Sequence, residues 1–162
     1  EKQLSAGGEH YALKDVLGEG GYGSVYRCIR ASDESLFALK LIDPVRIGFY
    51  SGEAGIRQLE ALAAREVSIL KKLSGHPGII SLEDAFRAED SKQLFLLTEF
   101  IAGGDLFSQI VDSAVPFQES EAAYVTAQLA DALAFCHSKG IAHRDAKPEN
   151  VLVKHVSVRL SE

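Results

Sequence analysis

The short segment Ile141–Asn150 constrains this chain more than any other, because it gathers a carboxylate, two cations and a carboxamide between a predicted helix and a short apolar strand. Charged groups are costly to bury without partners, so this segment suits a surface site better than a core. Asp145 could accept a proton from an attacking hydroxyl, and Lys147 could neutralise charge on a transferring phosphoryl group. Asn150 could hold a metal ion by its carbonyl oxygen. The segment therefore predicts phosphoryl-transfer chemistry.

Residues His143–Asn150 resemble the catalytic loop of eukaryotic protein kinases, His-Arg-Asp-x-Lys-Pro-Glu-Asn. Ala146 stands where that family usually has leucine, a change that weakens local packing and removes no chemical group. The alternative is a charged surface turn that matches by accident, and seven fixed residues in eight positions argue against it. If the resemblance holds, the other kinase motifs must lie upstream in a fixed order.

A glycine-rich motif, G-x-G-x-x-G-x-V, joins two predicted strands, Tyr11–Gly20 and Gly23–Arg30. Glycines let backbone amides approach phosphate oxygens closely. The same spacing occurs in the Rossmann fingerprint, but that loop opens a helix, whereas Ser24–Arg30 is rich in strand formers. Standing alone, the motif would fit a plain hairpin turn equally well. By the resemblance it binds nucleotide phosphates, through Gly18, Gly20, Gly21, Gly23 and Val25.

A third predicted strand, Ser35–Ile42, carries one charge, Lys40, inside an apolar run. An isolated lysine in a strand is usually a solvent-facing residue. This strand resembles the Val-Ala-Ile-Lys element of kinases, which implies that Ala38 contacts the nucleotide and that Lys40 pairs with its phosphates.

A helix is predicted over Ile56–Leu73, after a loop at Asp43–Gly55, with an apolar stripe of Leu59, Leu62, Ile69 and Leu73. Glu66 falls on that stripe, and a carboxylate on a buried face needs a cation. Lys40 is the candidate, because this ion pair orients the phosphate-binding lysine in kinases. The alternative places Glu66 at the stripe's edge, in water.

Two further strands are predicted at Ile79–Arg87 and Gln93–Phe100, and the stretch Thr98–Phe107 resembles the segment that joins the two lobes of a kinase. Gly103-Gly104-Asp105 by itself would be a loop and a helix cap. The resemblance implies that Thr98 lies at the back of the adenine pocket, that backbone groups of Glu99 and Ile101 bond the adenine edge, and that Asp105 bonds the ribose.

Two helices are predicted in the second half of the chain, Asp105–Ser113 and Glu119–Lys139, followed by short strands at Val151–Val153 and Ser157–Leu160. His76 and His137 are expected to be structural. An apolar face of the longer helix is expected to lack part of its cover, and it consists of Val125, Leu129, Leu133 and Cys136.

Composition limits the class of protein. The chain has 162 residues, 46% of them hydrophobic, and its formal net charge of -6 argues against nucleic acid or an anionic membrane surface as the main partner. Cys28 and Cys136 have no metal-ligand spacing, so neither a disulfide framework nor a zinc site is indicated, and a cytoplasmic or nuclear location is expected. No apolar run is long enough to span a bilayer. The chain contains no methionine, so we expect it to be a piece of a longer protein.

The expected fold is α+β and protein kinase-like: a complete N-terminal β-sheet lobe with one long helix, followed by the first helices and the catalytic loop of the C-terminal lobe. The expected domains are an N-terminal extension at 1–10, the N-lobe at 11–100 and a partial C-lobe at 101–162. The resemblance implies ATP and Mg²⁺ as cofactors, with Asn150 as a metal ligand. It also implies four catalytic residues, Asp145, Lys147, Lys40 and Glu66.

Lys147 lies two residues after Asp145, which points to the serine/threonine branch of the family. The chain looks most like the calcium/calmodulin-dependent group, including phosphorylase kinase catalytic subunits, and calcium/calmodulin regulation of a longer protein stays open. Asp105 and Glu149 resemble acidic positions that read an arginine in a protein substrate, so a basophilic kinase is expected.

Kinases carry an Asp-Phe-Gly motif after the catalytic loop, and its aspartate would fall near Glu162; the motif is absent from this sequence. We therefore expect a fragment that lacks the activation segment and has little turnover. The alternatives are a truncated, non-catalytic nucleotide-binding pseudokinase or partner-binding product, and a small-molecule phosphotransferase of kinase-like fold.

Overall fold

The computed structural model describes residues 3–6, 8–20, 23–42, 53–87, 93–114 and 116–154. The chain forms two compact units. The first comprises Glu1–Gly75 and Ile80–Phe100, and the second comprises His76–Ile79 and Ile101–Glu162. The assignment of a kinase lobe to each of the predicted domain ranges stays a prediction.

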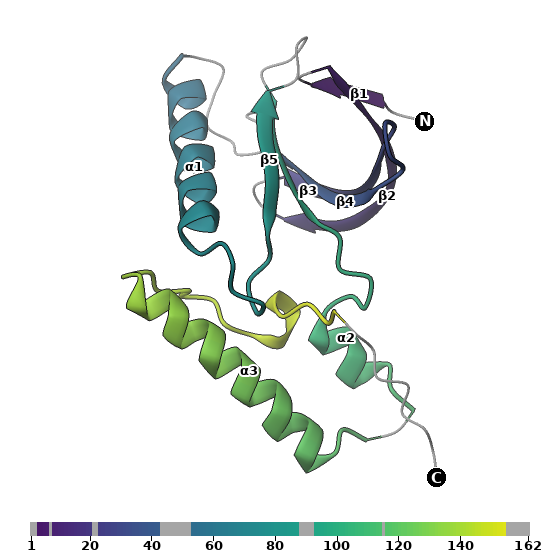
Figure 1. Ribbon diagram of the computed structural model, residues 1–162, viewed down its shortest axis with the longest axis vertical. Helices are drawn as coiled ribbons and strands as arrows, with labels where there is room; N and C mark the ends of the chain where they lie inside the picture. Colours follow the sequence, from purple (N-terminus) through teal and green to yellow (C-terminus); the bar gives the residue numbers. More distant parts are fainter. Residues whose placement is uncertain are drawn as a thin grey trace. The chain divides into compact units, whose positions relative to one another are not determined.

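An antiparallel six-stranded sheet dominates the first unit, with the strand order β1-β2-β3-β4-β6-β5. Figure 1 shows how strongly this sheet curls. Its strands are β1 (Gln3–Ala6), β2 (Glu9–Gly20), β3 (Gly23–Arg30), β4 (Leu36–Ile42), β5 (Leu82–Arg87) and β6 (Leu94–Glu99). The five strands expected in this part of the chain are present within a few residues, whereas β1 was not predicted. It lies in the expected N-terminal extension and is too short to show a periodic pattern.

Residues on the two faces of the sheet enter two hydrophobic clusters, because successive side chains of a strand point to opposite faces. In β6, Phe95 and Leu97 join the cluster inside the curl, and Leu96 joins the cluster against the helix. The first cluster contains Tyr11, Cys28, Phe37, Leu39, Phe95 and Leu97, and the second contains Ile42, Leu59, Ala63 and Leu96. Full burial of such a side chain contributes about 1.5–3 kcal/mol, so these clusters hold the unit together.

Helix α1 (Glu53–Lys72) packs beside β5 and β6 and begins earlier than predicted, within the expected loop. Its buried residues are Leu59 and Ala63, whereas Leu62, which was assigned to the apolar stripe, is 39% exposed. The buried side of the helix therefore passes through Ala63 and not through Leu62. An ion pair between Arg87 of β5 and Glu60 also ties the helix to the sheet.

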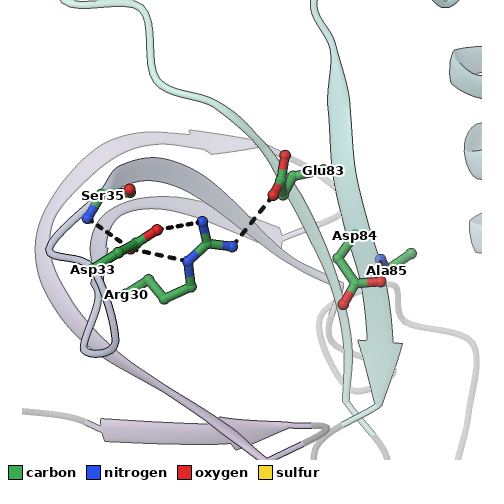
Figure 2. A network of polar contacts seen from close by, with 6 residues as sticks. All are labelled: Arg30, Asp33, Ser35, Glu83, Asp84 and Ala85. Carbon is green, nitrogen blue, oxygen red and sulfur yellow. Dashed lines mark hydrogen bonds and ion pairs between the residues drawn. The ribbon is translucent and has the colours of Figure 1, made fainter.

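Arg30, the last residue of β3, links that strand to β5 across the curl of the sheet, as Figure 2 shows. Its guanidinium donates to Asp33 at 3.1 and 2.7 Å and to Glu83 of β5 at 3.3 Å. The same group lies 4.7 Å from the centre of the Phe37 ring. Strands β3 and β5 are not neighbours in the sheet, so these contacts depend on the curl and help to maintain it.

The second unit contains helices α2 (Leu106–Val111) and α3 (Glu119–Ser138) and the 3₁₀ turn η1 (Pro148–Asn150). The predicted strand Val151–Val153 is reduced to one bridge, between Asp105 and Leu152, and the predicted strand 157–160 lies outside the described residues.

The apolar face of α3 is partly covered. Cys136 is buried, and Val125, Leu129 and Leu133 are half-buried. Among the described residues of this unit, the exposed large apolar side chains are Phe107, Ile110, Val111, Tyr124 and Leu152. The uncovered surface therefore lies mainly on α2.

Cys28 and Cys136 are free, buried thiols. Burial raises the pKa of the Cys28 thiol to about 11, so it stays protonated and unreactive at neutral pH. Across the part of the chain that the structure describes, no helix is long and apolar enough to cross a membrane.

Candidate active site

Lys40 and Glu66 form the ion pair that the sequence predicted. The Lys40 Nζ lies 2.6 Å from Oε1 and 2.8 Å from Oε2 of Glu66, and both side chains are half-buried. Strand β4 supplies the lysine, and α1 supplies the carboxylate one turn beyond the buried Ala63. The pair joins the helix to the sheet and fixes the direction of the lysine amino group.

Four residues assigned to nucleotide binding lie on one face of the sheet around this pair. Val25 lies directly opposite Lys40 in the β3–β4 register, and Ala38 lies opposite Thr98 in the β4–β6 register. Directly opposed residues share a face, as do residues two apart in one strand. The Thr98 hydroxyl also donates to the Ala38 carbonyl oxygen at 3.4 Å. The sheet thus brings Val25, Ala38, Lys40 and Thr98 together.

The glycine-rich motif is a hairpin between β2 and β3, with Glu19 opposite Ser24 and Gly20 opposite Gly23. A strand follows the loop, so the Rossmann alternative is excluded. Gly18, Gly20 and Gly23 are described, whereas Gly21 lies outside the described residues.

Gly23 is required for a reason that the motif did not suggest. Its φ is +146°, and a Cβ at this position would lie 1.8 Å from the Leu41 carbonyl oxygen. The close approach is to strand β4, so this glycine serves packing within the sheet whether or not it also serves a phosphate.

The catalytic-loop candidates form a tight polar cluster in the second unit. The Asn150 side-chain amide donates to both the main-chain oxygen and the Oδ2 atom of Asp145, each at 2.8 Å. The Lys147 Nζ lies 3.2 Å from the same Oδ2. Arg144 adopts a φ of +67°, a conformation that reverses the chain just before Asp145.

These contacts determine the protonation state of Asp145. The hydrogen bond from Asn150, followed by that from Lys147, holds the pKa of the Asp145 carboxyl below its usual range. Asp145 is therefore an ionised, exposed carboxylate at neutral pH, which is the state that a proton acceptor needs.

Asn150 fits the metal role through one atom. Its side-chain N–H group donates a hydrogen bond to Asp145, so its carbonyl oxygen is the side-chain atom that could bind a cation. The described part of the chain holds no group of three or more His, Cys, Asp or Glu side chains that could hold a metal ion. One oxygen is compatible with Mg²⁺, which keeps several waters and shares substrate phosphates, but further ligands must come from elsewhere.

Asp105 caps helix α2, which was the simpler of its two predicted roles. Its carboxylate accepts the Ser108 N–H and the Ser108 hydroxyl, each at 2.8 Å, and these bonds lower its pKa. Its neighbour Leu106 donates its N–H to Val151 at 2.8 Å, and Val153 donates to Gly104 at 2.9 Å. These bonds place Asp105 beside the segment that follows Asn150, and its proposed contact with ribose stays a prediction.

The candidate residues thus form two sets, one in each compact unit. The first unit holds the Lys40–Glu66 pair, the glycine hairpin and Glu99, and the second holds Ile101, Asp105 and the Asp145 cluster. His76 has the structural role expected of it, since it accepts the Gly78 N–H at 3.1 Å and stacks on Phe135 with ring centres 4.8 Å apart. No sequence signal pointed to Ser81, whose main-chain N–H donates to the Glu99 carboxylate.

Comparison with known proteins agrees with this geometry. Residues 11–162 match the family described as "Protein kinase domain". The chain is 37% identical over 155 residues to a probable serine/threonine-protein kinase, fhkC, of Dictyostelium discoideum, covering 94% of this chain and 24% of that protein. It is 40% identical over 139 residues to calcium-dependent protein kinase 5 of Plasmodium berghei, covering 86% and 22%. It is 33% identical over 158 residues to calcium/calmodulin-dependent protein kinase type II of Caenorhabditis elegans, covering 95% and 20%.

The chain belongs to the protein kinase domain family, and its curled antiparallel sheet with accompanying helices is a kinase-like α+β fold. It spans between 20% and 24% of the length of these three relatives.

Proposed function

We propose that this chain is part of a serine/threonine protein kinase that transfers the γ-phosphoryl group of ATP to a protein hydroxyl. The observation that carries the proposal is the Asp145 cluster: an ionised carboxylate held by Asn150, with the Lys147 ammonium on the same oxygen. Family membership supports it, and so does the name of the Dictyostelium discoideum relative, a probable serine/threonine-protein kinase.

In the proposed reaction, the oxygen of a substrate hydroxyl forms a bond to the γ-phosphorus, the bond to the ADP leaving group breaks, and the hydroxyl proton passes to Asp145. Lys147 stabilises charge on the transferring group, and Lys40, oriented by Glu66, holds the phosphates of ATP. Bound Mg²⁺ would neutralise phosphate charge, with Asn150 as one ligand.

Several finer proposals go with this one. The chain resembles the calcium/calmodulin-dependent group, and two of its relatives carry calcium in their names. We place it in that group, in a longer protein of the cytoplasm or nucleus that phosphorylates sites with an upstream arginine, read by Asp105 and Glu149. This piece by itself, without an activation segment, would phosphorylate substrate slowly. A non-catalytic role is less favoured, because Lys40, Asp145 and Asn150 are all present and all hold the contacts described above.

The test is phosphoryl transfer from labelled ATP to serine peptides with and without an upstream arginine, using the longest protein that carries this domain. We expect transfer to the arginine peptide, and a loss of at least a thousandfold in Asp145→Asn or Lys40→Met with the fold retained. The control is Ser138→Ala, at the C-terminal end of α3, which should not change the rate of transfer. Equal transfer by Asp145→Asn and the unmodified protein would exclude the proposed base.

A further inference from the structure

Three hydrogen bonds join Ser81 to Glu99, the last residue of β6. The Glu99 N–H donates to the Ser81 carbonyl oxygen at 3.1 Å. In return, the Glu99 Oε1 atom accepts the Ser81 N–H at 2.9 Å and the Ser81 hydroxyl at 3.1 Å. Ser81 immediately precedes β5, so both ends of the contact lie at the margin of the sheet. We call this pair the Ser81–Glu99 clamp.

The clamp holds the end of β6 against the residue that precedes β5. On the other side of the strand, Thr98 pairs with Ala38 of β4. Because the Glu99 N–H is donated to Ser81, the main-chain group of Glu99 that can meet an adenine edge is its carbonyl oxygen. A carbonyl oxygen accepts, so its partner on adenine would be the exocyclic amino group. The resemblance to kinases implies that Glu99 meets the adenine edge, and the clamp would restrict Glu99 to recognition of a donor group there.

The clamp also lies close to two connections between the compact units. The chain passes from one unit to the other at Gly75–His76, at Ile79–Ile80 and at Phe100–Ile101. Ser81 is one residue from the second passage, and Glu99 is one residue from the third. The three hydrogen bonds thus fasten two of the three connecting segments to each other within the first unit.

We propose that Ser81 is a positioning residue for adenine recognition: through Glu99, it holds the main-chain oxygen that accepts the adenine amino group. The inference rests on the proposed nucleotide-binding function and adds to it a residue outside the kinase motifs. Ser81 does not itself touch the nucleotide.

The test compares nucleotide affinities of the longest protein that carries this domain and of its variants by calorimetric titration. Ser81→Ala removes the hydroxyl donor and should weaken ATP binding roughly three- to tenfold, the range that one hydrogen bond is worth. Ser81→Thr retains a hydroxyl on the same carbon and should restore the affinity. Glu99→Ala should weaken ATP binding as well, and adding Ser81→Ala to it should weaken binding no further, because both act through one contact.

A second nucleotide separates positioning from a general structural effect. Purine riboside triphosphate lacks the 6-amino group, so its affinity should not respond to Ser81→Ala. The matched control is Ser138→Ala, because Ser138 is also an exposed serine whose hydroxyl donates one hydrogen bond, to Phe135 at 2.7 Å. It should leave both affinities unchanged. Hydrogen exchange at the Glu99 amide, which needs no nucleotide, should become faster in Ser81→Ala.

The outcomes separate this inference from the proposed function. If the unmodified protein does not bind ATP, both are overturned. If it binds ATP and Ser81→Ala binds equally well, or weakens both nucleotides by the same factor, the positioning role alone is overturned. Unchanged exchange at the Glu99 amide would also overturn it.

Discussion

At the scale of single residues, the chemistry of the candidate site depends on how Asp145 is held. One of its side-chain oxygens, Oδ2, receives both the Asn150 amide and the Lys147 ammonium. Both donors favour the charged form, so the pKa of the carboxyl lies below its ordinary value. A group with a depressed pKa in the folded state stabilises that state above its unfolded pKa, and the contribution is lost as the pH falls through the folded value.

Removing the hydrogen bond from Asn150, the largest single cause of the low pKa, should change the titration of Asp145. In Asn150→Ala, the pKa of Asp145 should rise toward its ordinary value, so that more of the carboxyl is protonated at a given acidic pH. Carbon-13 NMR titration of the carboxyl group measures this, and the acid limb of any pH–rate profile should move to higher pH. Lys147→Met should raise it as well, since the lysine lowers the pKa both through its hydrogen bond and through its charge. An Asp145 titration unaffected by Asn150→Ala would show that the amide does not control it.

At the scale of the elements, the sheet sets the position of the nucleotide-binding candidates. The register between β3 and β4 places Val25 opposite Lys40, and the bonds between Lys40 and Glu66 align α1 with that strand. Gly23 allows the start of β3 to lie against Leu41, because no side chain fits between them. Arg30 secures the opposite end of β3 to β5.

Gly23→Ala should therefore disrupt the β3–β4 pairing. A Cβ 1.8 Å from the Leu41 carbonyl oxygen, at a φ of +146°, forces the strands apart, so we expect a loss of about 3 kcal/mol or more in the free energy of unfolding. Gly18→Ala is the matched control in the same hairpin, since nothing lies within 4 Å of the added Cβ and φ is not positive. It should cost less than about 1 kcal/mol. Urea unfolding measures both, and equal losses would contradict the packing argument.

At the scale of the whole molecule, the two units differ in how much apolar surface they bury. The two hydrophobic clusters found among the described residues both lie in the first unit, where Leu39 and Leu97 are fully buried. The buried apolar residues of the second unit in the same ranges are Leu106, Ala132 and Cys136. Local stability follows the density of buried apolar contacts, so the first unit should resist opening more strongly.

Native-state hydrogen exchange should show this difference. The amides of β4 and β6 should exchange more slowly than those of α3 in the same chain. Leu97→Ala should cost about 2–5 kcal/mol and speed up exchange in the first unit, because it leaves a cavity at a fully buried position. Ala130→Gly, at an exposed position on α3, is the control and should affect only that helix. Equal protection of the two units would contradict the proposed difference.

Much of the fold and part of the site followed from local pattern in the sequence. Alternating or continuous apolar runs predicted five of the strands, and the buried stripe around Glu66 required a cation, which the structure supplies as Lys40. The His143–Asn150 loop could be assigned because its residue types stand at fixed spacing in one short segment. Tertiary structure decided the contacts that have no local signal: the pairing of β1 with β2, the approach of Gly23 to Leu41, the bond from Arg30 to Glu83, and the Ser81–Glu99 clamp. Each of these joins residues whose proximity depends on strand register or sheet curl. Periodicity reports which face of an element is buried, whereas the identity of the partner across that face is determined only when the sheet closes.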